Sequence, residues 1–337
     1  MKTTLDQFQG LLFKAAATVI SEPEARYFAQ EEIENYLKRP IDERWLPGIV
    51  REIKSWQENP NLNPKVLAQT PGSILYDFQG LGASLKLKEI QDSLEKRAKK
   101  NGVALAAIRN NSGDHALSIW TSGLAKRNLI GLAFVNGGNS VMPYGGTRAM
   151  FGTNPMSYAI PTFDRPIIAD MATSELAFFR FKEALDNKRE VGDKTLVDES
   201  GQYTKNPKMA ATPSGSARIM PMGGGFKGYA IVMLVEILAG ALTRSKTSTL
   251  EKPACYDSRA YGTLIMAIDI ASFTSVKAFK KSVTNMCQAI RQQRPAPYAD
   301  KVMVPGDRSS FLFEKLKQTG VDIPEEIITD LKELATH

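Results

Sequence analysis

Apolar residues follow two spacings along the chain, and each spacing predicts a kind of element. From Leu5 to Val19 they recur every three or four positions, which is one face of a helix. A second helix is expected after Ser21, where Glu24 completes a capping box and Pro23 falls in the tolerant first turn. Later apolar runs are near-continuous, as in buried strands, with amphipathic helices between some of them. The strand segments are residues 72–78, 103–110, 129–136, 165–172 and 261–270.

Helices that alternate with buried strands predict a mixed sheet in an α/β (α+β) fold. The two ends of the chain read as helical, so we expect a helical domain from residues 1–71 and 275–337 and a sheet domain from residues 72–274. Near the C-terminus, Asp322 is expected to cap a helix that has Pro324 in its first turn. The polar, Gly- and Pro-rich stretch 190–216 predicts a long surface excursion.

Composition narrows the class of protein. Of the 337 residues, 43% are hydrophobic and 23% are charged, which is typical of a soluble globular chain. The longest apolar run is interrupted by Glu236 and Gly240, so no membrane span is expected. Cys255 and Cys287 are the only cysteines, and with no secretory leader in evidence we expect a reducing, cytoplasmic location. The net charge of +7 is scattered, which favours anionic small molecules over nucleic acid.

Only two histidines are present, His115 and His337. A Ser-His-Asp triad or a multi-histidine metal site would therefore have to be built around His115. With so few cysteines as well, the sequence predicts no metal site.

A run of glycines at 223–228, "GGGFKG", leads into the apolar segment 229–242. It is not a P-loop, because Lys227 is followed by Gly228 rather than by Ser or Thr. The spacing of a Rossmann fingerprint can be fitted, but the preceding residues 217–222 form a poor strand. Two interpretations stay open: a phosphate cradle at a helix N-terminus, or a hinge before a buried helix.

Five stretches, taken in order, carry a resemblance. They are "FGTNPMSYAIP" (151–161), "IADMATSE" (168–175), "VDESGQYTKNP" (197–207), "GGGFKGYAIVMLVEILAGAL" (223–242) and "VPGDRS" (304–309). Together they resemble the malate/L-lactate dehydrogenase family that is unrelated to the Rossmann dehydrogenases. The resemblance implies a non-Rossmann site for NAD or NADP on a mixed sheet, and a homodimer.

Carried over by position, the resemblance also implies site residues. Lys227 would offer a point charge to phosphate, and Arg308 a bidentate fork. Asp170 would lie near the nicotinamide and take part in proton transfer, or would only cap nearby amides. Asn154 would bind substrate or would only hold a turn. The expected cofactor-binding residues are Ile168, Asp170, Met171, Ala172, Thr173, Ser174, Phe226, Lys227, Gly306, Asp307 and Arg308.

The sequence departs from the family near residue 40. Family members carry a histidine there, the expected acid that protonates the substrate oxygen, but "LKRPIDERWLPG" contains none. Arg44 is expected to hold the substrate carboxylate. The acid could be His115, or Asp42 or Glu43 if burial raised the carboxyl pKa. Alternatively, the substrate could be an iminium, which needs no proton at the hydride step, or turnover could have been lost.

These observations predict an NAD(P)H-dependent oxidoreductase that reduces a small 2-oxo acid. One alternative is a reductase of cyclic imino acids. Another is a dinucleotide-binding relative that no longer turns over substrate.

Overall fold

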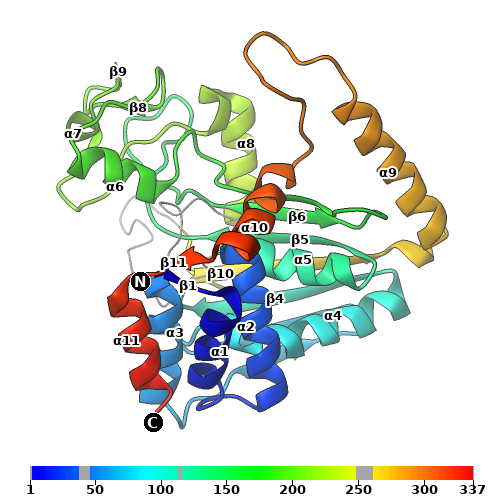
Figure 1. The fold of residues 1–337 in the computed structure, drawn as a ribbon. Helices are drawn as coiled ribbons and strands as arrows, with labels where there is room; N and C mark the ends of the chain where they lie inside the picture. The colour runs from blue at the N-terminus through cyan, green and yellow to red at the C-terminus, as the bar shows by residue number, and fades with distance from the viewer. Residues whose placement is uncertain (1, 38–45, 113–115, 248–260, 337) are drawn as a thin grey trace.

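The computed structural model describes residues 2–37, 46–112, 116–247 and 261–336. A seven-stranded sheet lies at the centre, with helices on both of its faces (Figure 1). Of the neighbouring strands in this described sheet, β3 and β4 are parallel and the other pairs are antiparallel. In spatial order the strands are β2 (Lys65–Gln69), β3 (Ser73–Asp77), β4 (Val103–Asn111), β10 (Tyr261–Asp269), β5 (Leu129–Asn136), β6 (Met156–Ile160) and β7 (Ile167–Met171). The sheet contains both parallel and antiparallel pairs, so the predicted mixed sheet is confirmed. It differs in this from a doubly wound nucleotide-binding sheet, which is mostly parallel.

One face of the sheet is covered by α4 (Leu87–Asn101) and α5 (Ser118–Lys126). Alternate residues of β4, among them Ala104 and Ala106, are fully buried in the same core cluster as Trp120 of α5. Successive side chains of a strand point to opposite faces, so Ala104 and Ala106 lie on the side of the sheet that α4 and α5 cover.

The other face carries two separate helical elements. The first is α8 (Phe226–Val235), which continues into the π-helical turn η4 (Glu236–Ala241) and packs on β5 and β10. The second is α9 (Val276–Arg291), whose Cys287 lies in a small core with Ile167 of β7.

The N- and C-terminal segments pack together below the sheet (Figure 1). Their helices are α1 (Leu5–Ala16), α2 (Glu22–Tyr36), α3 (Leu46–Glu58) and α11 (Glu325–Leu334). The predicted capping box forms, because Ser21 N donates to Glu24 Oε2 at 3.3 Å. The predicted cap at Asp322 is wrong: Asp322 lies in β11 (Val321–Asp322), opposite Lys2 of β1 (Lys2–Thr3), and α11 begins only after Pro324.

The stretch 190–216 does more than cross the surface. With α6 (Phe178–Asp186) it forms a lobe that contains β8 (Leu196–Val197), β9 (Tyr203–Thr204) and α7 (Pro207–Ala210). Leu196 and Ala210 are fully buried there in a core with Phe181 of α6. The predicted surface excursion was therefore wrong for these positions, because isolated apolar residues in a polar stretch give little periodic signal.

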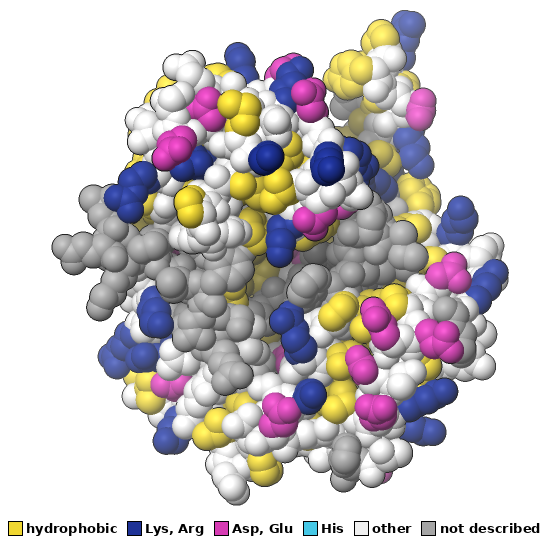
Figure 2. Space-filling model, turned by 90° about the vertical axis from the view of Figure 1, so that its left-hand side faces the viewer, with side chains coloured by type: hydrophobic (Ala, Val, Ile, Leu, Met, Phe, Trp, Pro, Cys, Tyr) yellow, Lys and Arg dark blue, Asp and Glu magenta, His cyan; other side chains and the backbone are white. Residues whose placement is uncertain are grey.

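The division into two domains stays a prediction. Strand β2 joins the large sheet, and α9 packs on it, although both fall in the expected helical part. None of the described helices is long and apolar enough to cross a membrane. On the face shown in Figure 2, Lys and Arg side chains are interspersed with Asp and Glu rather than gathered in one stripe.

Candidate functional site

A cavity of about 530 Å³ lies beside β7 and the first turn of α10 (Asp307–Thr319). Residues 168–171 line one side, and residues 303–306 and 308–310 line another. Asn35 of α2 and Ser118 of α5 complete the lining. Two stretches that lie far apart in the sequence, both expected to bind the cofactor, therefore share one cavity.

Asp170 both caps a helix and lines this cavity. Its Oδ2 accepts a hydrogen bond of 2.9 Å from Ser118 N, the first residue of α5. A carboxylate is favoured at a helix N-terminus, where the free amides and the helix dipole carry positive partial charge. The two interpretations of Asp170 are thus compatible, since the group that holds α5 in place also faces the cavity.

The 304–308 turn is fixed from both sides. Gly306 has φ +98°, and a Cβ there would lie 3.1 Å from Ile168 N, so glycine suits both the backbone angle and the close approach. Pro305 O accepts from Ile168 N at 3.2 Å. Asp307 is 5% exposed and faces inward, accepting two hydrogen bonds from Arg291 and one from Val304 N. These bonds, chiefly those from Arg291, lower the pKa of Asp307.

Arg308 is exposed, whereas its neighbour Asp307 is buried. Arg308 is also among the residues that line the cavity. In this turn, Asp307 therefore holds the backbone, whereas the exposed residue Arg308 lines the cavity.

Thr173 and Ser174 follow β7, and their side-chain hydroxyls form hydrogen bonds within the protein. Thr173 is fully buried, and its Oγ1 donates to the carbonyls of Asn154 and Thr153. Ser174 Oγ donates to Leu176 O at 2.8 Å. Neither of them lines the cavity, nor does the partly buried Ala172. The hydroxyls of Thr173 and Ser174 therefore anchor the chain after β7, and contact of residues 172–174 with a cofactor stays a prediction.

The glycine run joins the site through the backbone. Met222 N donates to Thr173 O at 2.9 Å, which places the run at the end of β7. A Cβ on Gly228 would lie 1.8 Å from Met222 O, so only glycine allows α8 to start there. Phe226 is 65% exposed, with its ring 6.3 Å from that of Tyr144 and at a steep angle to it.

Lys227 is exposed, and neither Lys227 nor Phe226 lines the cavity. The third expected cofactor stretch is therefore linked to the other two by the main chain, with its side chains outside the shared cavity.

Asn154 belongs to a buried polar cluster. It is fully buried with φ +38°, and its Nδ2 donates to Val232 O and to Glu236 Oε2, at 3.1 and 2.9 Å. Glu236 also accepts from Asn136 Nδ2 at 3.3 Å, so this buried carboxylate is hydrogen-bonded as expected for a structural residue. Asn154 holds a turn against α8 and does not line the cavity, and its contact with substrate stays a prediction.

Three expected residues, Asp42, Arg44 and His115, lie outside the described residues, as does Glu43. The roles suggested for them stay predictions. Within the described residues, no three His, Cys, Asp or Glu side chains are grouped as metal ligands would be.

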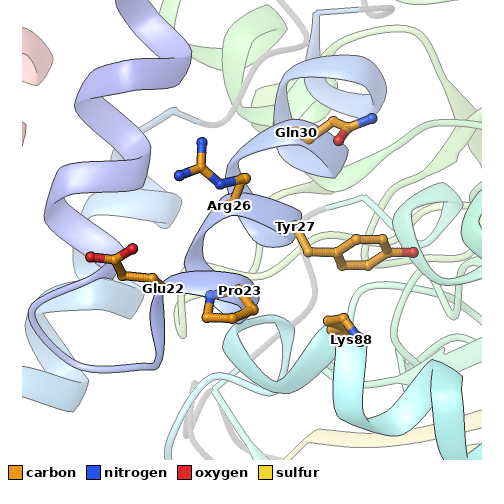
Figure 3. Close-up of a pocket in the computed structure, with 6 residues that line it drawn as sticks. All are labelled: Glu22, Pro23, Arg26, Tyr27, Gln30 and Lys88. Carbon is orange, nitrogen blue, oxygen red and sulfur yellow. The ribbon is translucent and has the colours of Figure 1, made fainter.

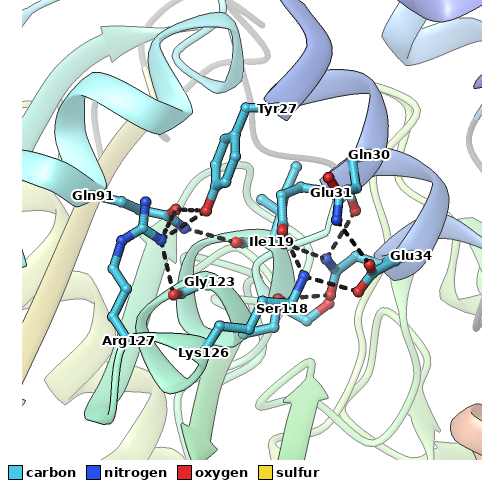
Figure 4. A network of polar contacts seen from close by, with 12 residues as sticks. Tyr27, Gln30, Glu31, Glu34, Gln91, Ser118, Ile119, Gly123, Lys126 and Arg127 are labelled. Carbon is cyan, nitrogen blue, oxygen red and sulfur yellow. Dashed lines mark hydrogen bonds and ion pairs between the residues drawn. The ribbon is translucent and has the colours of Figure 1, made fainter. Parts of the chain in front are cut away.

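The sequence did not single out Asn35, which reaches the cavity from the helical part of the fold. It is 2% exposed, donates to Glu31 O at 2.9 Å, and accepts from Ser122 Oγ of α5 at 3.1 Å. Lys126, at the far end of α5, pairs with Glu31 and Glu34 of α2 (Figure 4). The two helices are therefore joined along their length, which fixes the cavity wall that they form.

A second hollow lies on the surface between α2 and α4 (Figure 3). Several of its polar groups are used elsewhere: Lys88 pairs with Asp92 at 2.6 Å, and Tyr27 Oη donates to Gln91 Oε1 at 2.6 Å. Arg26 stacks over the ring of Phe13. The hollow therefore offers few converging groups for a ligand.

Comparison with solved structures shows that other proteins share this fold. Malate dehydrogenase from Entamoeba histolytica superposes with a TM-score of 0.85 at 22% identity, covering 100% of this chain and 97% of that one. Sulfolactate dehydrogenase from Methanocaldococcus jannaschii gives 0.84 at 23% identity, with the same coverage. This chain therefore shares its fold with these two proteins.

The family model for malate/L-lactate dehydrogenase matches residues 44–332, and the chain belongs to this family. The malate/(S)-sulfolactate dehydrogenase of Methanothermus fervidus is 29% identical over 293 residues, covering 86% of this chain and 83% of the relative. The delta(1)-pyrroline-2-carboxylate/delta(1)-piperideine-2-carboxylate reductase of Pseudomonas putida is 30% identical over 297 residues, with the same two coverages.

The turn at Asp307 gives a prediction about stability. Asp307→Asn should lower the free energy of unfolding at pH 7 by about 1–3 kcal/mol, because charged hydrogen bonds to Arg291 are lost at a buried site. Arg291 lowers the pKa of Asp307 below its ordinary 3.8. The stabilisation is therefore present above that pH and is lost as the pH falls through the lowered pKa. Urea unfolding at pH 7 and near pH 3 should show the difference shrinking on acidification.

Asp164→Asn is the matched control. Its carboxylate lies 3.7 Å from the same guanidinium but is 61% exposed, so we expect a change below about 0.5 kcal/mol. Equal stability of Asp307→Asn and wild type at pH 7 would contradict the anchoring role.

Proposed function

We propose that this protein is an NAD(P)H-dependent oxidoreductase that reduces a small 2-oxo acid. The observation that carries the proposal is the shared cavity: residues 168–171 line it together with Gly306 and Arg308, and both stretches are expected from family membership to bind dinucleotide. The relatives named above are dehydrogenases and reductases, and acids are the substrates in their names.

The residues around the cavity fit a dinucleotide. The guanidinium of Arg308 would offer a fork to phosphate oxygens, and Ser309 and Ser310 line the same cavity. Lys227 and the exposed ring of Phe226 would contact the part of the cofactor that extends past β7. Bound NADH or NADPH would supply the hydride, and Asp170 would orient the end of the site nearest α5.

Reduction of a ketone needs a proton as well as a hydride, because the carbonyl oxygen becomes a hydroxyl. A positioned acid contributes about 10²–10⁴ to the rate of such a step. We assign the proton to His115, with Asp42 as the other candidate, and we assign the substrate carboxylate to Arg44. All three assignments rest on sequence position.

A cyclic imino acid is the second candidate substrate. The reductase of Pseudomonas putida has imino acids in its name and is 30% identical to this chain. A protonated C=N bond takes up hydride to give a neutral amine, so that step needs no acid. This chemistry would suit a chain without the usual histidine near residue 40.

A relative that binds dinucleotide without turnover is the third possibility, which the missing histidine motivates. Whichever function holds, we propose a homodimer, as the family resemblance implies. We also keep the cytoplasmic location as a prediction.

The role of Arg308 can be tested by cofactor titration. Arg308→Gln should raise the Kd for NADH or NADPH about 10–100-fold, because a charged hydrogen bond to phosphate contributes about 1.5–3 kcal/mol. Fluorescence titration measures it. Arg294→Gln, at an exposed arginine that does not line the cavity, should leave the Kd unchanged. Failure of wild type to bind either dinucleotide would refute the proposed function.

The substrate class is tested by turnover with pyruvate, oxaloacetate, 2-oxoglutarate and Δ1-piperideine-2-carboxylate. We expect reduction of at least one 2-oxo acid, and His115→Ala should lower its kcat by about 10²–10⁴-fold, as the loss of an acid does. An unchanged rate would remove His115 from the mechanism. Activity with the imino acid alone would favour the second candidate, and dinucleotide binding without turnover the third.

A further inference from the structure

Two cations lie beside one exposed aromatic ring in the first part of α10. Lys301 Nζ is 4.0 Å from the centroid of the Phe311 ring, and Arg165 Cζ is 5.0 Å from the same centroid. We call Arg165 and Lys301 the cation pair. Phe311 is 47% exposed, so the pair is open to solvent. Each cation is attracted to the ring, but the two like charges repel each other, and a bound anion would relieve that repulsion.

No carboxylate forms an ion pair with either cation within the described residues. Two acids of the same wall, Asp164 and Asp307, lie 3.7 and 2.7 Å from the guanidinium of Arg291. Asp307 also interacts with the charge of Arg165, but its hydrogen bonds from a side chain come from Arg291. Asp300 is exposed and precedes the lysine of the pair in the sequence without pairing with it. The pair therefore keeps its positive charge available to an anion.

The cation pair lies next to the cavity beside β7. Ser310 directly precedes Phe311 and lines that cavity, and Met303, two residues after Lys301, lines it as well. Arg308 is another lining residue, and residues three apart on a helix are neighbours on its surface, so Arg308 lies beside Phe311. The cavity thus has one cation in its lining and two more adjoining it.

The pair lies at the adenosine end of the site, a step that rests on the proposed function. Asp170, which is expected near the nicotinamide, lies three residues after Ile167, the first residue of β7, or about 10 Å along the strand. Arg165 precedes Ile167 in the chain and so lies toward the opposite end of the strand. A dinucleotide with its nicotinamide near Asp170 and a phosphate on Arg308 would therefore extend its adenosine half toward the pair.

We propose that the cation pair binds the 2′-phosphate of NADPH, and that the protein uses NADPH in preference to NADH. The two dinucleotides differ only in this phosphate, a terminal monoester with a charge of about −1.5 to −2 at pH 7. In other nucleotide-binding folds an acid selects the ribose hydroxyl of NAD, and an arginine accommodates the phosphate of NADP. Here the acids Asp164 and Asp307 are held by Arg291, and an arginine and a lysine are left for the phosphate.

The three cations have different roles in this arrangement. Arg308 binds a phosphate that both dinucleotides carry, whereas Arg165 and Lys301 contact only the additional phosphate. Loss of Arg308 therefore weakens the binding of both cofactors, while loss of the pair weakens the binding of NADPH alone.

The test compares both cofactors on the same variants by fluorescence titration. Wild type should have a Kd for NADPH about tenfold or more below that for NADH. Arg165→Gln/Lys301→Gln should raise the Kd for NADPH about tenfold or more, because charged hydrogen bonds are lost, and should change that for NADH by less than about twofold. Lys317→Gln is the matched control and should change neither Kd. Lys317 lies 4.8 Å over the ring of Phe313 on the same helix, but it pairs with Glu314.

A second measurement needs no nicotinamide. Adenosine 2′,5′-bisphosphate should displace bound NADPH from wild type at a concentration about tenfold lower than adenosine 5′-monophosphate does. The double variant should lose this difference. Equal displacement by the two nucleotides from wild type would contradict a site for the 2′-phosphate.

The outcomes separate this inference from the proposed function. If wild type binds NADH as tightly as NADPH, the inference is overturned and the proposed function stands. An equal loss of both cofactors in a double variant that circular dichroism shows to be folded also overturns it. If that variant is unfolded, Lys301→Gln, at an exposed residue, carries the test, with an expected rise of about threefold or more in the Kd for NADPH alone and an unchanged Kd as the contrary result. Binding of neither dinucleotide by wild type refutes the proposed function, and this inference with it.

Discussion

The site depends on how the backbone groups around β7 are satisfied. This strand has β6 on one edge, and on the other its Ile168 N donates to Pro305 O. Just after the strand, Thr173 donates to Thr153 O and accepts from Met222 N. Buried amides and carbonyls need such partners, and here the partners come from three distant parts of the chain. Segments with little structure of their own are thereby brought to one place.

The cavity beside β7 follows from this arrangement. The 304–308 turn lies against the strand because Asp307 is held by Arg291 of α9, which itself packs on β6 and β7. Opposite the turn, α5 is held by Asp170 at its first residue and by α2 along its side. Ion pairs and hydrogen bonds from four elements thus fix the walls around a space that no single element encloses.

Much of the fold could be predicted from the sequence, because long apolar runs and helical spacing are local signals. The strands β4 and β5 were found close to their observed bounds. Strand β6 (Met156–Ile160) is short and its residues alternate between buried and partly buried, so it was missed. Asp322 was misassigned because its pairing with Lys2 joins opposite ends of the chain, which no local pattern reveals.

The candidate site was predictable in position but not in side-chain direction. Family motifs located the 168–174 and 306–308 stretches, yet Thr173 and Asp307 face inward while Arg308 lines the cavity. Neighbouring residues of one motif differ in this way because one of them forms hydrogen bonds with a partner from elsewhere in the chain, as Asp307 does with Arg291, and is buried by it. Asn35 gave no signal at all, since a buried asparagine becomes recognisable only when its partners on α5 are known.

The helix formed by α8 and η4 is a second case in which the sequence does not show which way side chains point. Its sequence is apolar on all sides, which predicts burial without saying what buries it. Glu236 sets the orientation, because its carboxylate is held by Asn136 and Asn154 and so turns one side of the helix toward the sheet. A buried carboxylate left without those bonds would be costly, so the helix has little freedom to rotate. The outward direction of the exposed Leu234 and Ile237 is therefore a consequence of where one charge is placed.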